Sequence, residues 1–86
     1  MTAQRYEIVL TPPARRAIAA DLPEAVAAAV IEFVTTALLD NPQRVGKPLR
    51  DDLEGIWSAR RGTYRVLYRI EADTISVGHI ARRPAD

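Results

Sequence analysis

The sequence predicts a small α+β domain in the order β-α-α-β-β-β, with a helical hairpin packed on a twisted antiparallel sheet. Apolar and polar residues alternate over 5–10, as they do in a half-buried strand. Apolar residues then recur at the helical period over 26–38, and alternation returns over 64–71. Because 86 residues have room for one hydrophobic core, residues 1–86 are expected to form a single domain.

Proline and capping residues set the bounds of the two helices. The Thr-Pro-Pro segment at 11–13 is a typical helix start, with Thr11 as the N-cap and proline in the first turn. The first helix is expected over 12–20, because the Leu-Pro pair at 22–23 opens the second, and an Asn-Pro pair ends that one at 41–42. The buried stripe of the second helix is expected to consist of Val26, Val30, Phe33, Val34, Ala37 and Leu38.

The second half of the chain predicts three strands. Residues 41–55 hold two prolines, two glycines and many charged side chains, which is typical of a loop. Strands are then expected over 56–60, 64–71 and 74–82, with short turns between them. Strands joined by such hairpins pair antiparallel.

The composition excludes several classes of site. Without cysteine there is no disulfide framework and no thiolate metal site, and the single histidine argues against structural zinc. No glycine-rich phosphate loop or His-Glu metal pattern occurs, so no metal or cofactor is expected. No apolar run approaches the roughly 18 residues that span a membrane, and the N-terminus lacks signal-peptide features. The protein is therefore expected to be cytoplasmic.

The net charge of +1 hides an uneven distribution of charged residues. Residues 1–42 carry three arginines against five acids, whereas residues 43–86 carry nine cations against six acids. Eleven of the twelve cations are arginine, whose planar fork suits phosphate, and Lys47 is the sole lysine. Composition alone fits a bias in codon usage equally well.

Cationic side chains gather on the strands predicted in the second half. Arg65 and Arg69 lie on one face of the middle strand, and Tyr64 and Tyr68 lie on the other. With helices on the apolar face, the cationic face is expected to look outward as a phosphate-binding surface, the alternative being a solvated sheet face. Further cations near this sheet are Lys47, Arg50, Arg60, Arg61, Arg82 and Arg83.

His79 is the only side chain of a type that titrates near neutral pH. It shares the strand parity of Val77, which predicts a partly buried position and favours a structural histidine over a catalytic one. Trp57, in the strand before the hairpin, is expected to lie in the core or to face a partner.

A longer pattern spans residues 41–83. It combines a helix-ending Asn-Pro, a Gly-Lys-Pro-Leu-Arg loop, Leu-x-Gly, the run Ser-x-Arg-x-Gly-x-Tyr-Arg-Val-x-Tyr, and a last strand that ends in two basic residues. In these motifs and their spacing the chain resembles the RelE family of bacterial type II toxins, within the RelE/ParE superfamily. The spacing separates the two activities of that superfamily less well.

The resemblance implies a RelE-like domain that cleaves mRNA in the ribosomal A site without a metal and is inhibited by a small antitoxin. In that reaction the ribose 2′-OH attacks the adjacent phosphate, which leaves a 2′,3′-cyclic phosphate and a free 5′-OH. The resemblance further implies that Arg65 and Arg83 are catalytic and that Arg50 lies near the substrate. Arginine stabilises a dianionic transition state well, but it exchanges protons poorly because its pKa lies above about 12.

The sequence departs from the family pattern at the groups that move protons. Ile56 and Ser58 stand where the resemblance implies two lysines, and the family's tyrosine would follow just beyond Asp86. His79 is then the only candidate base, and it joins Arg65 and Arg83 as a candidate catalytic residue.

Three functions follow as hypotheses. The favoured one is a ribosome-dependent mRNA endoribonuclease whose RNA contacts are Lys47, Arg50, Arg60, Arg61 and Arg82. The second is a ParE-like inhibitor of DNA gyrase with the same fold, and the third is a module that only binds an antitoxin. The expected partners are an acidic antitoxin, partly disordered when free, and the ribosome with its mRNA, but no membrane.

Overall fold

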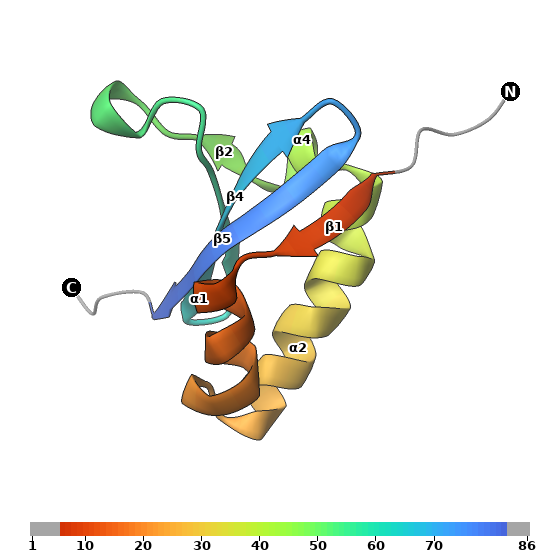
Figure 1. Cartoon of the computed structure of the whole chain (residues 1–86), viewed down its shortest axis with the longest axis vertical. Helices are drawn as coiled ribbons and strands as arrows, with labels where there is room; N and C mark the ends of the chain where they lie inside the picture. The colour runs from red at the N-terminus through yellow and green to blue at the C-terminus, as the bar shows by residue number, and fades with distance from the viewer. Residues whose placement is uncertain (1–5, 83–86) are drawn as a thin grey trace, which may run out of the picture.

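The computed structural model describes residues 6–82 and confirms the α+β class (Figure 1). The elements in chain order are β1 (Glu7–Leu10), α1 (Pro12–Arg16), η1 (Ala17–Asp21), α2 (Glu24–Thr35), α3 (Ala37–Asp40), α4 (Pro42–Val45), β2 (Lys47–Pro48), η2 (Asp51–Leu53), β3 (Trp57–Arg61), β4 (Tyr64–Glu71) and β5 (Thr74–Arg82). Within the described range, no helix is both long and apolar enough to cross a membrane.

The five strands form one sheet in the order β1-β5-β4-β3-β2. The pairs from β2 to β5 are antiparallel, as predicted, but β1 pairs in parallel with β5, with Ile8 opposite Ile75. The sheet is therefore mixed, and the expectation of a purely antiparallel sheet is wrong at this edge. A helical crossover after β1 allows the chain to return in the parallel direction, which a tight hairpin does not.

The helices predicted on either side of the Leu-Pro pair at 22–23 both form, but neither is an uninterrupted α-helix. The Thr11 hydroxyl accepts a hydrogen bond from the backbone N–H of Ala14 and donates one to the carbonyl of Gly78, which joins the start of α1 to β5. α1 continues through the π-helical segment η1, and the second helix is divided into α2, α3 and α4. The hydroxyls of Thr35 and Thr36 donate to backbone carbonyls of the preceding turn, and the backbone leaves the helical region at Thr36.

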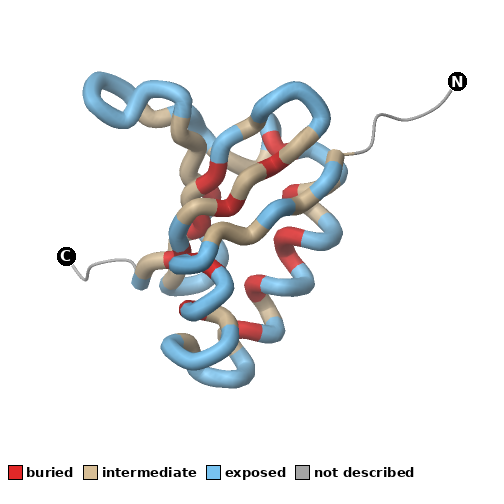
Figure 2. Tube along the Cα trace, in the orientation of Figure 1, coloured by how far each residue is buried: buried red, intermediate tan, exposed pale blue. Residues whose placement is uncertain are grey.

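One hydrophobic core lies between the helices and one face of the sheet (Figure 2). The predicted helical stripe faces this core: Val30, Phe33, Val34 and Leu38 are buried, and Val26 and Ala37 are half-buried. From the sheet, the buried residues are Ala59, Val66, Tyr68, Ile75, Val77 and Ile80. The helices and the core thus lie on one face of the sheet only.

Tyr68 ties the β2 edge of the sheet to the helices. Its ring stacks on Trp57, with 6.4 Å between the ring centroids, and its hydroxyl donates to the carbonyl of the buried Pro42. Gly46 makes room for this hydroxyl, because a Cβ at that position would overlap it. Burial raises the pKa of Tyr68 to about 12, so the hydroxyl keeps its proton to a higher pH than an exposed tyrosine does. These contacts hold the start of β2, and with it Lys47, beside β3.

Candidate functional site

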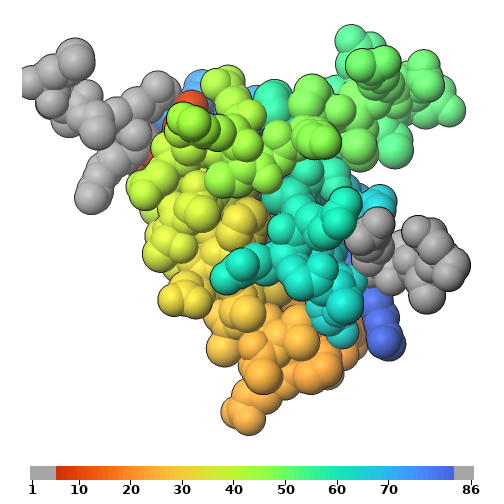
Figure 3. Space-filling view, turned by 180° about the vertical axis from the view of Figure 1, so that it is seen from behind, coloured from red at the N-terminus to blue at the C-terminus, as the bar shows by residue number. Residues whose placement is uncertain are grey.

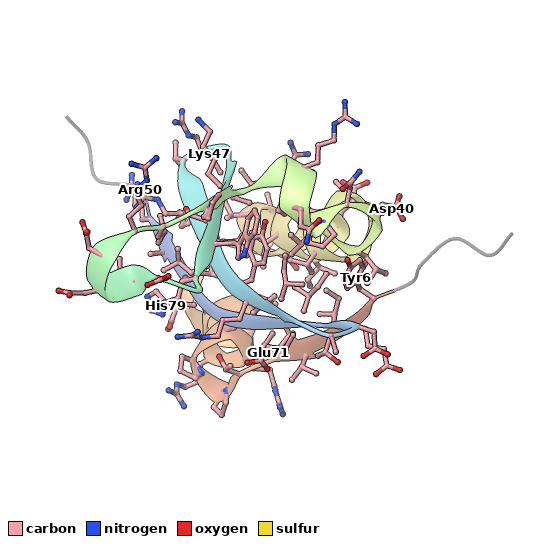
Figure 4. The ribbon with its side chains drawn as sticks, turned by 90° about the horizontal axis from the view of Figure 1, so that it is seen from above. Tyr6, Asp40, Lys47, Arg50, Glu71 and His79 are labelled. Carbon is pink, nitrogen blue, oxygen red and sulfur yellow. The ribbon has the colours of Figure 1, made fainter. Side chains whose placement is uncertain are left out.

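The face of the sheet away from the core, which we call the open face, carries several of the charged residues of β2 to β5. Alternation along β4 places Val66 and Tyr68 in the core and Arg65 and Arg69 on the open face, as predicted. Lys47 and His79 lie toward one side of the molecule (Figure 4). The open-face residues that matter below are Lys47, Ser58, Arg60, Arg65, Leu67, Arg69, Ser76 and His79.

Three cations line one depression of the open face, which we call the cationic hollow. It has a volume of about 390 Å³ and is lined by Val45, Lys47, Leu49, Ser58, Arg60 and Arg65. Three strands contribute, because Lys47 pairs with Ser58 between β2 and β3, and Arg60 pairs with Arg65 between β3 and β4. β2 lies in a stretch that the sequence indicated as loop, so the place of Lys47 in the sheet was not foreseen.

Arg60 and Arg65 make the cationic hollow suitable for an anion. Like charges directly opposite each other destabilise a strand pair. An anion between the two guanidinium groups removes this repulsion and accepts hydrogen bonds from both, in the planar geometry that arginine offers to phosphate. Lys47 adds a third positive charge to the lining of the hollow. The arrangement can therefore bind a phosphate group.

Two of the predicted cations lie elsewhere. Arg61 follows Arg60 in β3 and points to the other face, where its guanidinium lies 6.0 Å from the centroid of the Phe33 ring. The sequence alone could have predicted that Arg60 and Arg61 point to opposite faces, because neighbours in a strand do so. Arg82, at the end of β5, lines a separate hollow. Arg83 lies outside the described residues.

Arg50 lies close to the cationic hollow without lining it. It is exposed and directly precedes η2, on a loop over 49–56 that projects from the body of the molecule (Figure 3). The base of this loop is closed by a hydrogen bond of 2.8 Å from the N–H of Leu49 to the carbonyl of Ile56. Since Leu49 lines the hollow, Arg50 can contact a bound chain that extends beyond it.

His79 is exposed, so the prediction of a partly buried position is wrong. The cause is a β-bulge: Tyr68 pairs with Val77 and Leu67 pairs with His79, which leaves Gly78 as an extra residue in β5. The extra residue shifts the strand parity. His79 therefore lies on the open face, although Val77 is buried.

A second depression adjoins the first. This apolar hollow, of about 240 Å³, is lined by residues that include Ile56, Leu67, Arg69, Ser76 and His79. Leu67 lies between Ser58 and His79 across the strands and so separates the apolar hollow from the cationic one. Leu67 and Ser76 were not predicted as site residues, although alternation in β4 already placed Leu67 on the face of Arg65.

Comparison with known proteins identifies the family of this chain. The family model described as the ParE toxin of the type II toxin–antitoxin system parDE matches residues 8–84. Toxin RelE of Mycobacterium tuberculosis is 52% identical over 82 residues, which cover 93% of this chain and 84% of that protein. This chain belongs to the RelE/ParE family of type II toxins. The resemblance seen in the sequence is thereby confirmed.

Further relatives agree with this assignment of the toxin. Toxin RelG of Mycobacterium tuberculosis is 50% identical over 72 residues, which cover 84% of this chain and 82% of that protein. The solved toxin–antitoxin complex RelBE2 of Mycobacterium tuberculosis matches with a TM-score of 0.86 and 46% identity, over 92% of this chain and 99% of that chain. The YoeB dimer of Staphylococcus aureus, at 16% identity and a TM-score of 0.68 over 94% of this chain and 99% of that one, shares the fold.

Proposed function

We propose that this toxin is an endoribonuclease that cleaves mRNA on the ribosome and thereby inhibits translation. The observation that carries the proposal is the opposition of Arg60 and Arg65 beside Lys47 in the cationic hollow. Cations that converge on one place in a sheet suit a phosphodiester backbone. The identity of 52% to a protein named Toxin RelE supports this choice.

The proposed reaction is attack of a ribose 2′-OH on the adjacent phosphate, with a 2′,3′-cyclic phosphate and a free 5′-OH as products. Negative charge builds up on the phosphate oxygens in the transition state. Arg65, assisted by Arg60, stabilises that charge, and one such contact contributes about 2.7–4 kcal/mol. Arg83, beyond the described residues, is proposed as a second catalytic arginine from the family pattern alone.

The RNA chain is proposed to extend from the cationic hollow in two directions. Lys47 and Arg60 contact the phosphate backbone within the hollow, and Arg50 contacts it from the projecting loop. Arg82 lies at the far end of β5, where it suits a more distant phosphate or ribosomal RNA. We leave Arg61 out of the RNA contacts because its guanidinium lies over Phe33 on the other face.

We also propose an antitoxin partner. The RelBE2 structure, to which this chain is 46% identical, is a toxin–antitoxin complex. A cationic hollow on an open sheet face is complementary to an acidic segment, and such a segment would exclude phosphate from it. An antitoxin that is partly disordered when free can wrap both this face and the helices.

Substitution of Arg65 tests the proposed function. Arg65→Ala is expected to relieve growth arrest and to lower mRNA cleavage on translating ribosomes about 10²–10³-fold. Arg15→Ala, which removes an exposed arginine of α1, is the matched control and is expected to behave as the parent. Primer extension measures cleavage, and thermal unfolding of both variants checks the fold. Parental cleavage by a folded Arg65→Ala variant would overturn the proposal.

Gyrase inhibition is the second candidate, because the matched family model is described as the ParE toxin. A gyrase inhibitor blocks DNA supercoiling and leaves mRNA intact. Purified toxin is therefore assayed in parallel for supercoiling by gyrase and for cleavage of mRNA on ribosomes. Inhibition of supercoiling without cleavage would select this alternative.

A further inference from the structure

Four open-face residues form a single row across the sheet. Lys47 of β2 lies opposite Ser58 of β3, Ser58 lies opposite Leu67 of β4, and Leu67 lies opposite His79 of β5. The two ends of the row are a lysine and a histidine, which can both exchange a proton in water, whereas its middle is small or apolar. The bulge at Gly78 is what brings His79 into the row.

The arginine pair lies in the adjacent row. Arg60 is two residues beyond Ser58 in β3, and Arg65 is two residues before Leu67 in β4, so the two rows are about 7 Å apart. Across the strands, a phosphate held by these guanidinium groups would lie between Lys47 on the β2 side and His79 on the β5 side, and along the strands it would lie one row away from both. Lys47 lines the same hollow as both arginines.

We propose that Lys47 is the proton donor to the leaving 5′-oxygen and that His79 is the base that takes the proton of the 2′-OH. The inference rests on the proposed ribonuclease function and assigns the two groups that transfer protons in that reaction. Lys47 thus supplies from β2 what the resemblance led us to expect at Ile56 and Ser58. The arginines bind and stabilise the phosphate but exchange no proton.

The reaction is balanced with these two groups. Neutral His79 takes the 2′ proton while the bond from the 2′-oxygen to phosphorus forms. The bond from phosphorus to the 5′-oxygen breaks, and the ammonium of Lys47 gives its proton to that oxygen, which leaves as a free hydroxyl. A protonated His79 and a neutral Lys47 remain, and exchange with water restores both.

The spacing fits an in-line displacement, in which the attacking and leaving oxygens lie on opposite sides of phosphorus. Three strand spacings separate the backbones of Lys47 and His79 by roughly 14 Å. Each group must come within about 3 Å of its oxygen. The four-carbon stem of the lysine and the imidazole ring, inclined toward each other, can cover the remaining distance.

The charged neighbours of both groups are known. Lys47 faces Arg60 and Arg65 across the cationic hollow. His79 shares the apolar hollow with Arg69. It also lines the separate hollow of Arg82, together with Arg16 and Asp21. Cations predominate around both groups, so the 2′-oxyanion that develops near His79 lies in a positive surrounding.

A substrate with a better leaving group separates proton donation from phosphate binding. The parent, Lys47→Arg and His79→Gln are compared on ribosomes programmed with ordinary mRNA, and with mRNA that carries sulfur in place of the bridging 5′-oxygen in the A-site codon. A thiolate leaves without a proton. Lys47→Arg keeps the charge and is expected to cleave ordinary mRNA about 10²–10⁴-fold more slowly than the parent, but the sulfur substrate at the parental rate. His79→Gln is expected to cleave both substrates more slowly than the parent, by a comparable factor.

Other outcomes overturn the assignment. Parental cleavage of ordinary mRNA by Lys47→Arg, or an equal loss on both substrates, would reduce Lys47 to a phosphate contact. Cleavage by His79→Gln at the parental rate would show that His79 is not the base. If Arg65→Ala is inactive while Lys47→Arg is fully active, the inference fails and the ribonuclease function stands. If the parent cleaves neither substrate, both the inference and the proposed ribonuclease function are wrong. Thermal unfolding of each variant checks the fold.

Discussion

Arg60 and Arg65 lie directly opposite each other across the β3–β4 ladder, with both side chains on the open face. Nothing in folding favours two cations at one cross-strand position, where like charges oppose pairing. An anion between the two guanidinium groups relieves this repulsion, and that is the place we propose for a phosphodiester of the RNA.

The first prediction is that removal of one of these charges stabilises the free toxin. Arg65→Gln is expected to raise the free energy of unfolding at low salt by about 0.2–1 kcal/mol, the scale of a cross-strand pair. The gain should vanish in added phosphate, because the anion stabilises the parent through both arginines. Urea unfolding with and without phosphate measures this. A variant less stable than the parent at low salt would contradict the proposed repulsion.

The second prediction contrasts two neighbours in β3. Arg60→Ala is expected to weaken RNA binding and to reduce the slope of log affinity against log salt by about 0.7, the value for one phosphate contact on a single strand. Arg61→Ala should leave the slope unchanged and instead cost about 0.5–1 kcal/mol of stability, through the lost contact with the Phe33 ring. Equal slopes of log affinity against log salt for the two variants would show that RNA does not bind the open face in preference to the other face.

The third prediction concerns alkaline pH. Tyrosine in the unfolded chain titrates near 10, and burial raises the pKa of Tyr68 to about 12. The folded state therefore keeps this proton between about pH 10 and 12 while the unfolded state loses it, so stability is lost over that window and not below it. The parent should lose on the order of 2 kcal/mol more than Tyr68→Phe as the pH rises through it. A difference in unfolding free energy that stays constant from pH 9 upward would contradict this.

The fourth prediction concerns the contact between Gly46 and the hydroxyl of Tyr68. Gly46→Ala is expected to destabilise the fold by about 1–3 kcal/mol, because the added Cβ overlaps that hydroxyl. In a Tyr68→Phe background the cost should be smaller, since the overlapping oxygen is gone. A double-mutant cycle by urea unfolding measures the coupling, expected at about 0.5–3 kcal/mol. Additive effects would mean that Gly46 acts only through its own backbone.

Local patterns in the sequence were sufficient for the strands that carry the arginines. Period-two alternation placed Arg65 and Arg69 on one face of 64–71 and Val66 and Tyr68 on the other, and β4 has those bounds. The same local rule already separates Arg60 from Arg61, although the sequence interpretation grouped them. A side chain's face within one regular strand depends only on its neighbours in the chain.

Tertiary structure alone decided that β2 and β1 join the edges of the sheet and that the register shifts between β4 and β5. Lys47 lines the same hollow as the arginines because β2 pairs with β3. Just before β2, the Tyr68 hydroxyl donates to the carbonyl of Pro42, 26 positions earlier in the chain. His79 lies on the open face only because Gly78 is an extra residue relative to β4. Pairing and bulges are set by hydrogen bonds and packing between distant segments, so no periodicity within one segment contains them. The sequence by itself determined the elements and the arginine face, and the packed sheet decided which side chains share a site.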